Sequence, residues 1–188
     1  MKVVDTDALI VVDVQNDFCP GGALAVPKGD DVVPVINGLM PLFSHVLATQ
    51  DFHPPAHSSF AEQGGPWPVH CVQGTPGAEF HPSLNTSAID EIVQKGDDPA
   101  TDGYSGFAGT DLADRLRSLG VKRVVVTGLA TDYCVRATSV EAVGHGFEVA
   151  VVTDAIRAVD VNAGDGEKAV AEMESAGAAL IQAEQIHS

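Results

Sequence analysis

Short apolar runs rich in valine and isoleucine alternate along this chain with segments of helical spacing, and this alternation restricts the possible folds. The run DALIVVDV, residues 7–14, is almost continuously apolar, as in a strand buried on both faces of a parallel sheet. Later runs of this kind, and the helical segments between them, predict an α/β fold with right-handed crossovers. We expect one three-layer α/β/α domain with a mostly parallel central sheet of about six strands. The expected strands are residues 7–14, 45–50, 88–95, 122–128, 147–154 and 178–182. The expected helices are residues 29–44, residues 109–120, a segment after Cys134, and Asp165 to Ala176. Asp30 or Asp31 is the expected N-cap of the first helix.

Length and charge narrow the classes of function. The 188 residues, 45% of them hydrophobic, suffice for one domain over residues 1–188. The formal net charge of −16 argues against binding to nucleic acid or to an anionic membrane surface, because both need basic patches. No apolar run approaches the roughly 18 residues of a membrane span, and acidic residues interrupt the N-terminal run. The negative charge favours a small or neutral ligand. Three scattered cysteines are typical of reduced thiols, so we expect a cytoplasmic protein.

Charged and nucleophilic residues stand where the predicted strands end. Asp13 ends the first strand, Asp51 follows the second, Lys95 ends the third, and Cys134 follows the fourth. In open α/β sheets the ligand binds at the carboxyl ends of the strands, so we expect these four side chains to meet there. The proline- and glycine-rich segment 51–90 is predicted to be a long functional loop at the same edge.

Three of these residues form a potential nucleophilic set. Cys134 lies in TGLATDYCVRAT, where a helix begins, and a helix N-terminus lowers a thiol pKa and offers amides for an oxyanion. The alternative for Cys134 is a buried structural thiol. Asp13 is a charge in an apolar strand, suited to a general base but equally to an ion pair or a backbone cap. Lys95 is either a solvated surface charge or a cation that keeps Asp13 ionised and favours the thiolate.

The long loop carries a potential metal site. TQDFHPPAH supplies Asp51, His53 and His57, and WPVHC supplies His70. One carboxylate with two or three imidazoles suits a divalent metal ion, zinc first, with iron and manganese as alternatives. The spacing of Asp51 and His53 places both on one side of an extended segment. Taken singly, each histidine is more often an ordinary loop residue than a metal ligand.

These residues occur in blocks that resemble the nicotinamidases (pyrazinamidases) of the isochorismatase-like cysteine hydrolase family. The blocks are IVVDVQNDFCPGGALAV, ATQDFHP, WPVHCVQGTPGAEFHPSL, KG followed by YSGF, and GLATDYCVRATSVEAV. The resemblance covers the chain from the first strand to the last and implies the isochorismatase-like hydrolase fold. It also implies hydrolysis of the carboxamide of nicotinamide to nicotinate and ammonia through a cysteine thioester, in NAD salvage.

The resemblance also implies roles for individual residues. It makes Asp13, Lys95 and Cys134 the catalytic triad and makes Asp51, His53 and His70 the metal ligands, with His57 as a further ligand in some members. The amides of Ala130 and Cys134 would form the oxyanion hole, with a cis peptide before Ala130. Tyr133 departs from the histidine of many relatives. The residues implied to line the substrate pocket are Phe18, Leu24, Trp67, Tyr104 and Tyr133.

Several other functions are compatible with the same sequence. A related amidohydrolase or isochorismatase would act on isochorismate or an N-carbamoyl compound, although such relatives generally lack the Asp51–His53–His70 set. The metal could be the catalyst, with Cys134 only structural. A non-catalytic binding protein could use the same fold. Nicotinamide is the expected substrate and pyrazinamide a further one, while the oligomeric state, including a homo-oligomer, stays open.

Overall fold

The valine-rich runs pair into one parallel sheet. In the computed structural model, which describes residues 1–188, six strands lie in the order β3-β2-β1-β4-β5-β6, and all five pairings are parallel. This confirms the predicted α/β class. The strands are β1 (Asp7–Val12), β2 (His45–Asp51), β3 (Glu91–Lys95), β4 (Arg123–Leu129), β5 (Glu148–Arg157) and β6 (Ala179–Ile181).

Most strand boundaries differ from the sequence prediction, several of them by one residue and one each in β1, β3 and β5 by two or three residues, with β5 continuing to Arg157 instead of ending at residue 154. β1 ends at Val12, not at residue 14, because Asp13 has a φ of 47°, a left-handed conformation that extended strands do not use. β3 begins at Glu91, not at residue 88, because residues 86–88 form a 3-10 turn. The early end of β1 leaves Asp13 in a left-handed turn just beyond the carboxyl end of the strand.

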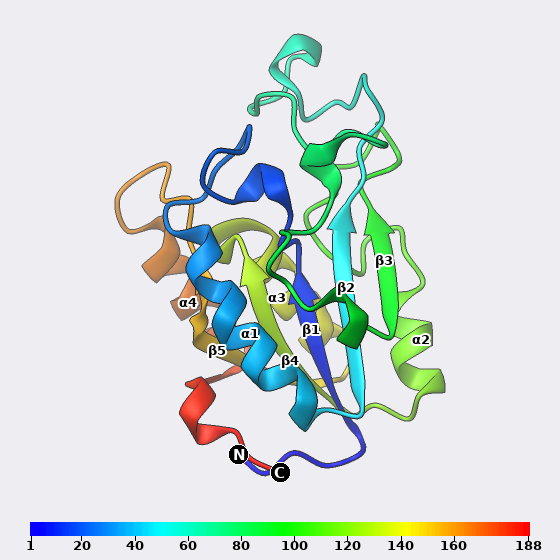
Figure 1. Cartoon of the computed structure of the whole chain (residues 1–188), viewed down its shortest axis with the longest axis vertical. Coiled ribbons are helices and arrows are strands. Elements are labelled where there is room, and N and C mark those ends of the chain that lie inside the picture. The colour runs from blue at the N-terminus through cyan, green and yellow to red at the C-terminus, as the bar shows by residue number, and fades with distance from the viewer.

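Helices cover both faces of the sheet, as Figure 1 shows with α1 in front of the strands and α3 behind them. The helix predicted at 29–44 is shorter, because 3-10 turns flank α1 and Pro41 lacks the amide that a longer helix would need. Asp31 occupies the N-cap position but its side chain makes no capping bond, since Asp31 already has helical dihedrals. None of the helices has the length and apolar character needed to cross a bilayer. The helices are α1 (Val32–Leu39), α2 (Leu112–Ser118), α3 (Arg136–Gly144) and α4 (Asp165–Ala176).

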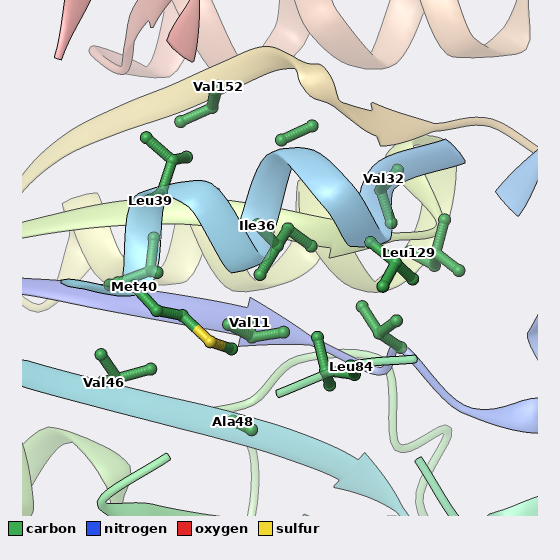
Figure 2. Close-up of a cluster of buried hydrophobic side chains, with 14 of the residues drawn as sticks. Val11, Val32, Ile36, Leu39, Met40, Val46, Ala48, Leu84, Leu129 and Val152 are labelled. Carbon is green, nitrogen blue, oxygen red and sulfur yellow. The ribbon is translucent and has the colours of Figure 1, made fainter. Parts of the chain in front are cut away.

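The core lies in two layers, one on each face of the sheet. Along β1, Leu9 and Val11 face the α1 layer, whereas Ile10 and Val12 face the layer that contains residues of α2, α3 and α4. This is the alternation that a strand imposes on its side chains. Figure 2 shows the first layer, where Ile36 of α1 lies over the central strands. Both layers are apolar, which explains why β1 reads as a continuous apolar run.

Loops rise beyond the carboxyl ends of the strands, above the arrowheads in Figure 1. The segment between β2 and β3 contains only 3-10 turns and isolated bridges, such as those that join His53 to Val72 and Phe60 to Trp67. The proline and glycine content of this segment suppresses longer elements. The irregular segment therefore lies directly over the edge where the polar strand ends meet.

Candidate active site

The side chains of Asp13, Lys95 and Cys134 meet below these loops. Lys95 Nζ lies 2.7 Å from Asp13 Oδ2 and 3.6 Å from Cys134 Sγ. Asp13 and Lys95 are 0% exposed and Cys134 is 5% exposed. Three sequence positions far apart are thus joined at the ends of β1, β3 and β4, as the strand-end rule predicts. A solvated surface position for Lys95 is excluded by this burial.

The backbone turn at Asp13 and the side chain of Thr49 hold the Asp13 carboxylate in place. The left-handed turn at Asp13 follows β1, and its backbone amide donates to the carbonyl of Thr49 on β2 at 3.3 Å. The hydroxyl of Thr49 donates to Asp13 Oδ1 at 2.6 Å, which leaves Oδ2 for Lys95. The carboxylate is therefore fixed by one neutral donor and one cation.

Lys95 joins the nucleophilic set to the potential metal site. Its ammonium also contacts the carboxylate of Asp51 and donates to the carbonyl of Gly103 at 2.8 Å. Burial by itself disfavours the ammonium, but the Asp13 and Asp51 carboxylates outweigh it and raise the pKa of Lys95 well above its ordinary value. Lys95 is therefore a permanent cation between two carboxylates, a link that sequence reasoning missed because it assigned Asp51 only to the metal.

The expectation of a lowered Cys134 pKa is wrong. Burial raises the pKa of this thiol well above its ordinary value; Lys95 opposes the rise, while Asp13 and Asp51 add to it. Cys134 lies in the π-helical turn Thr131–Val135, ahead of α3, which begins at Arg136. Removal of water and two nearby carboxylates together exceed any gain from the helix end. Cys134 therefore rests as a thiol and needs a base.

The two carboxylates differ in proton affinity. Burial raises the pKa of Asp13 above its ordinary value, against the opposing effect of Lys95 and with a further rise from Asp51. Burial acts on Asp51 too, but Lys95 and the hydrogen bond from His53 outweigh it and lower the Asp51 pKa. The expected ionising effect of Lys95 on Asp13 is present but does not prevail. Asp13 is consequently the better proton acceptor of the two.

Asp51, His53 and His70 form a buried group of potential metal ligands, all of whose ligand atoms lie within 4.8 Å of one another. Asp51 Oδ2 lies 3.3 Å from His53 Nε2 and 4.0 Å from His70 Nε2. Nδ1 of His53 lies 2.8 Å from the Gly96 carbonyl and Nδ1 of His70 lies 2.8 Å from the Pro68 carbonyl. Because a carbonyl only accepts, each Nδ1 carries the proton and each Nε2 offers a lone pair. This donor set fits a divalent metal ion.

His57 lies beside this group without belonging to it. Its ring centroid is 4.0 Å from that of His53, and its Nδ1 is 2.8 Å from the hydroxyl of Ser59. The backbone amide of Ser59 donates to the same Nδ1 at 3.2 Å, so the neutral ring carries its proton on Nε2, which is buried and makes no hydrogen bond. Burial and the neighbouring His53 lower the pKa of His57, which favours the neutral imidazole. A metal at Nε2 would require the other tautomer, in which Nδ1 carries the proton and donates to the Ser59 hydroxyl.

A pocket opens over Cys134 and the side chains of His53 and His70. Trp67 Nε1 donates to the Tyr104 hydroxyl at 2.9 Å, and the Tyr133 ring packs edge-on against Trp67 with centroids 4.8 Å apart. All five residues expected in the pocket lie in its wall. The lining residues are Phe18, Leu24, Asp51, His53, Ser59, Trp67, His70, Asp102, Tyr104, Ala130, Tyr133, Cys134 and Val159.

The family follows from the whole chain. The Isochorismatase domain model matches residues 7–185. The chain belongs to the isochorismatase family. Its fold and the site at the strand ends agree with this membership.

Relatives of this isochorismatase-family chain include enzymes named for amide hydrolysis. The nicotinamidase/pyrazinamidase of Mycobacterium tuberculosis is 45% identical over 93% of this chain and 97% of its own length. The pyrazinamidase of Pyrococcus horikoshii, solved in complex with zinc, is 50% identical, with a TM-score of 0.87 over 94% of this chain and 99% of that one. PnC1 from L. infantum, solved in complex with nicotinate, is 38% identical, with a TM-score of 0.94 over 100% of this chain and 98% of that one.

The family resemblance also implied a cis peptide, which is present between Leu129 and Ala130. The Ala130 amide has no acceptor within the chain, and Ala130 lines the pocket beside Cys134. This arrangement leaves an amide without an acceptor in the pocket wall that also contains Cys134.

Sequence reasoning missed three pocket residues. Val159 follows the end of β5, so the strand-end rule applied to that strand would have found it. Ser59 and Asp102 lie in loops, where no periodic signal indicates which side chains face inward.

Proposed function

We propose that this isochorismatase-family chain is a nicotinamidase, which hydrolyses nicotinamide to nicotinate and ammonia in NAD salvage. The observation that carries the proposal is the buried contact of Lys95 with Asp13 and Cys134 at the floor of an aromatic pocket. The names of the relatives support this substrate, and the Asp51–His53–His70 group beside the thiol agrees with it. Pyrazinamide, which differs from nicotinamide by one ring nitrogen, is the proposed second substrate.

The first step is proton transfer from Cys134 to Asp13. The thiol has a raised pKa, so it needs a base in contact, and the raised pKa of Asp13 makes it an effective acceptor. A carboxylate oxygen of Asp13 lies within 4.8 Å of Cys134 Sγ. The sulfur then attacks the carboxamide carbon, and Lys95 remains charged throughout, holding the emerging thiolate at 3.6 Å.

The second step releases ammonia. The oxygen of the tetrahedral intermediate accepts hydrogen bonds from the amides of Ala130 and Cys134, which stabilise its charge. Asp13 returns its proton to the departing nitrogen, the carbon–nitrogen bond breaks, and a thioester remains on Cys134. Asp13, again ionised, removes a proton from water as the water attacks the thioester, and nicotinate leaves with the thiol restored.

The remaining pocket residues orient the substrate. Asp51, His53 and His70, with His57 beside them, would hold one divalent metal ion, for which we propose zinc ahead of iron or manganese. When bound, such an ion supplies positive charge that orients the pyridine nitrogen and ordered water. Phe18, Trp67 and the tyrosines enclose the aromatic ring. All three cysteines are free, which supports the further proposal of a cytoplasmic location.

Ammonia release from nicotinamide, measured with zinc supplied, tests the proposal. We expect release by the unmodified protein, none by Cys134→Ala, and full release by Cys19→Ala, a matched control because Cys19 is also buried but lies outside the pocket. A thioester adduct on Cys134 should be detectable by mass spectrometry after rapid acid quench. Ammonia release by Cys134→Ala would show that the metal and not Cys134 is the catalyst. No release by the unmodified protein would show that nicotinamide is not the substrate.

A further inference from the structure

Asp132 ties the nucleophile's turn to a different part of the pocket. It lies in the turn Thr131–Val135 that carries Cys134, and it is 6% exposed. Its Oδ1 accepts the amide of Val159 and its Oδ2 accepts the amide of Asp160, both at 2.9 Å. A carboxylate that accepts two backbone amides forms charge-assisted bonds, which are stronger than neutral ones. Both oxygens are therefore committed to one short segment of the chain.

No cation competes for this carboxylate. Arg136, one turn further on, donates from Nη1 to Glu172 at 2.9 Å and from Nε to the backbone carbonyl of Asp132 at 3.2 Å. The guanidinium thus holds the main chain of the turn and a glutamate of α4, and it leaves the Asp132 side chain to the two amides. The Asp132 carboxylate therefore accepts hydrogen bonds only from the segment after β5.

Val159 packs against the α1 layer of the core, but the backbone of this segment depends on Asp132 for two hydrogen bonds. The amides of Val159 and Asp160 donate to no backbone carbonyl, so Asp132 supplies the hydrogen bonds of both. Asp160 has a φ of 51°, and its own Oδ1 accepts the amide of Gly166 at 2.7 Å in the first turn of α4. The connection therefore runs from the Cys134 turn through Asp132 to the residues that precede α4.

Val159 makes this connection relevant to the substrate. It lines the pocket together with Ala130 and Cys134, although it comes from the end of β5. A displacement of the Val159 amide by a fraction of an ångström would move this wall away from the bound ring, because the side chain follows the backbone. Asp132 thus links the position of this wall directly to the turn that carries Cys134.

We propose that Asp132 is a positioning residue that holds Val159 against the substrate ring and so determines substrate affinity. The inference rests on the proposed function, because affinity is defined here for nicotinamide. Asp132 itself does not touch the reacting atoms; it acts through Val159.

Steady-state kinetics of Asp132→Asn with nicotinamide test this role. The amide side chain can accept from only one of the two backbone N–H groups and sets its own NH₂ against the other. We expect KM to rise about tenfold, equivalent to about 1.4 kcal/mol of lost contact between Val159 and the substrate ring, while kcat changes less than about threefold. Val159→Ala should also raise KM, and the double variant should exceed the larger single effect only slightly, since the wall is already displaced.

Asp154→Asn is the matched control. Asp154 Oδ1 accepts the amide of Ala183 at 2.9 Å, a contact of the same chemistry outside the pocket. This variant should lower the melting temperature as Asp132→Asn does, with KM unchanged. If Asp132→Asn does not fold, the inference is tested with Val159→Ala alone. An unchanged KM of Val159→Ala for nicotinamide then overturns the inference.

The outcomes separate the inference from the function on which it rests. An active wild type with equal KM values for Asp132→Asn and Asp154→Asn would leave Asp132 a purely structural residue and overturn the inference alone. Additive effects of Asp132→Asn and Val159→Ala would also overturn it. A wild type that releases no ammonia would overturn the proposed function and the inference with it.

Discussion

Lys95 Nζ lies 3.6 Å from Cys134 Sγ, and neither side chain is more than 5% exposed. The same ammonium contacts the carboxylates of Asp13 and Asp51. One buried cation is thus shared by the proposed nucleophile, its proposed base and a potential metal ligand. Any change to Lys95 alters all three.

Replacement of Lys95 by methionine should abolish activity and weaken the fold. The change keeps the chain length but leaves two buried carboxylates without a cation, at a cost of about 3–5 kcal/mol in the free energy of unfolding. Urea unfolding and ammonia release measure the two effects. Lys168→Met is the control, because Lys168 pairs with Asp165 at the surface and should change stability by less than about 0.5 kcal/mol. Equal stabilities of the two variants would contradict the shared role of Lys95.

Loss of the base should lower the rate without removing the substrate. Asp13→Asn keeps the shape of the side chain but cannot take the thiol proton, so kcat should fall about 10²–10⁴-fold. Nicotinate binding, followed by calorimetry, should be retained. A kcat within tenfold of the unmodified protein would exclude Asp13 as the base.

The pH dependence of kcat/KM should report the ionisation of Asp13. Its carboxylate form is needed, and burial raises its pKa above the ordinary 3.8, so activity should be lost as the pH falls through a value above 3.8. The Thr49 hydroxyl bond lowers this pKa, and Thr49→Val should therefore move the acid limb to higher pH. A limb that stays in place or moves to lower pH in Thr49→Val would contradict the assignment.

Chelation should remove activity, and zinc should restore it. Metal content measured by mass spectrometry should be about one ion per chain before dialysis against a chelator and should fall after it. His53→Ala and His70→Ala should bind little metal, whereas His81→Ala, outside the pocket, should bind it normally. His57→Ala keeps the three converging ligands and should retain metal at lower affinity. Full activity of the metal-free protein would show that the reaction does not require the metal.

The aromatic wall should control KM. Trp67→Phe keeps a ring but loses the N–H that donates to Tyr104 at 2.9 Å, so a modest rise in KM is expected. Trp67→Ala also loses the edge contact with Tyr133 and should raise KM further, by about tenfold. Equal KM values for the two variants would show that the ring itself does not contact the substrate.

The sequence predicted the fold because local patterns carry it. Apolar runs buried on both faces indicated the parallel strands, and helical spacing placed α4 at Asp165–Ala176, as observed. The strand-end rule predicted that residues from β1, β3 and the turn after β4 would meet. These features depend on the periodicity of neighbouring residues and on the direction of parallel strands, both of which a sequence displays.

Other properties of the site arise only when distant segments pack together. The boundary of β1 depends on a left-handed turn at Asp13, the wall at Val159 depends on a contact with Asp132, and Lys95 reaches two carboxylates rather than one.

The Cys134 pKa is the clearest example. Its place before α3 indicated a lowered value, but burial and two carboxylates from other strands raise it. The sequence by itself determined which elements form and which side chains stand at their ends. Only the tertiary structure decided the charges they carry, because desolvation and electrostatic interaction depend on the distances between atoms in space, not on their separation along the chain.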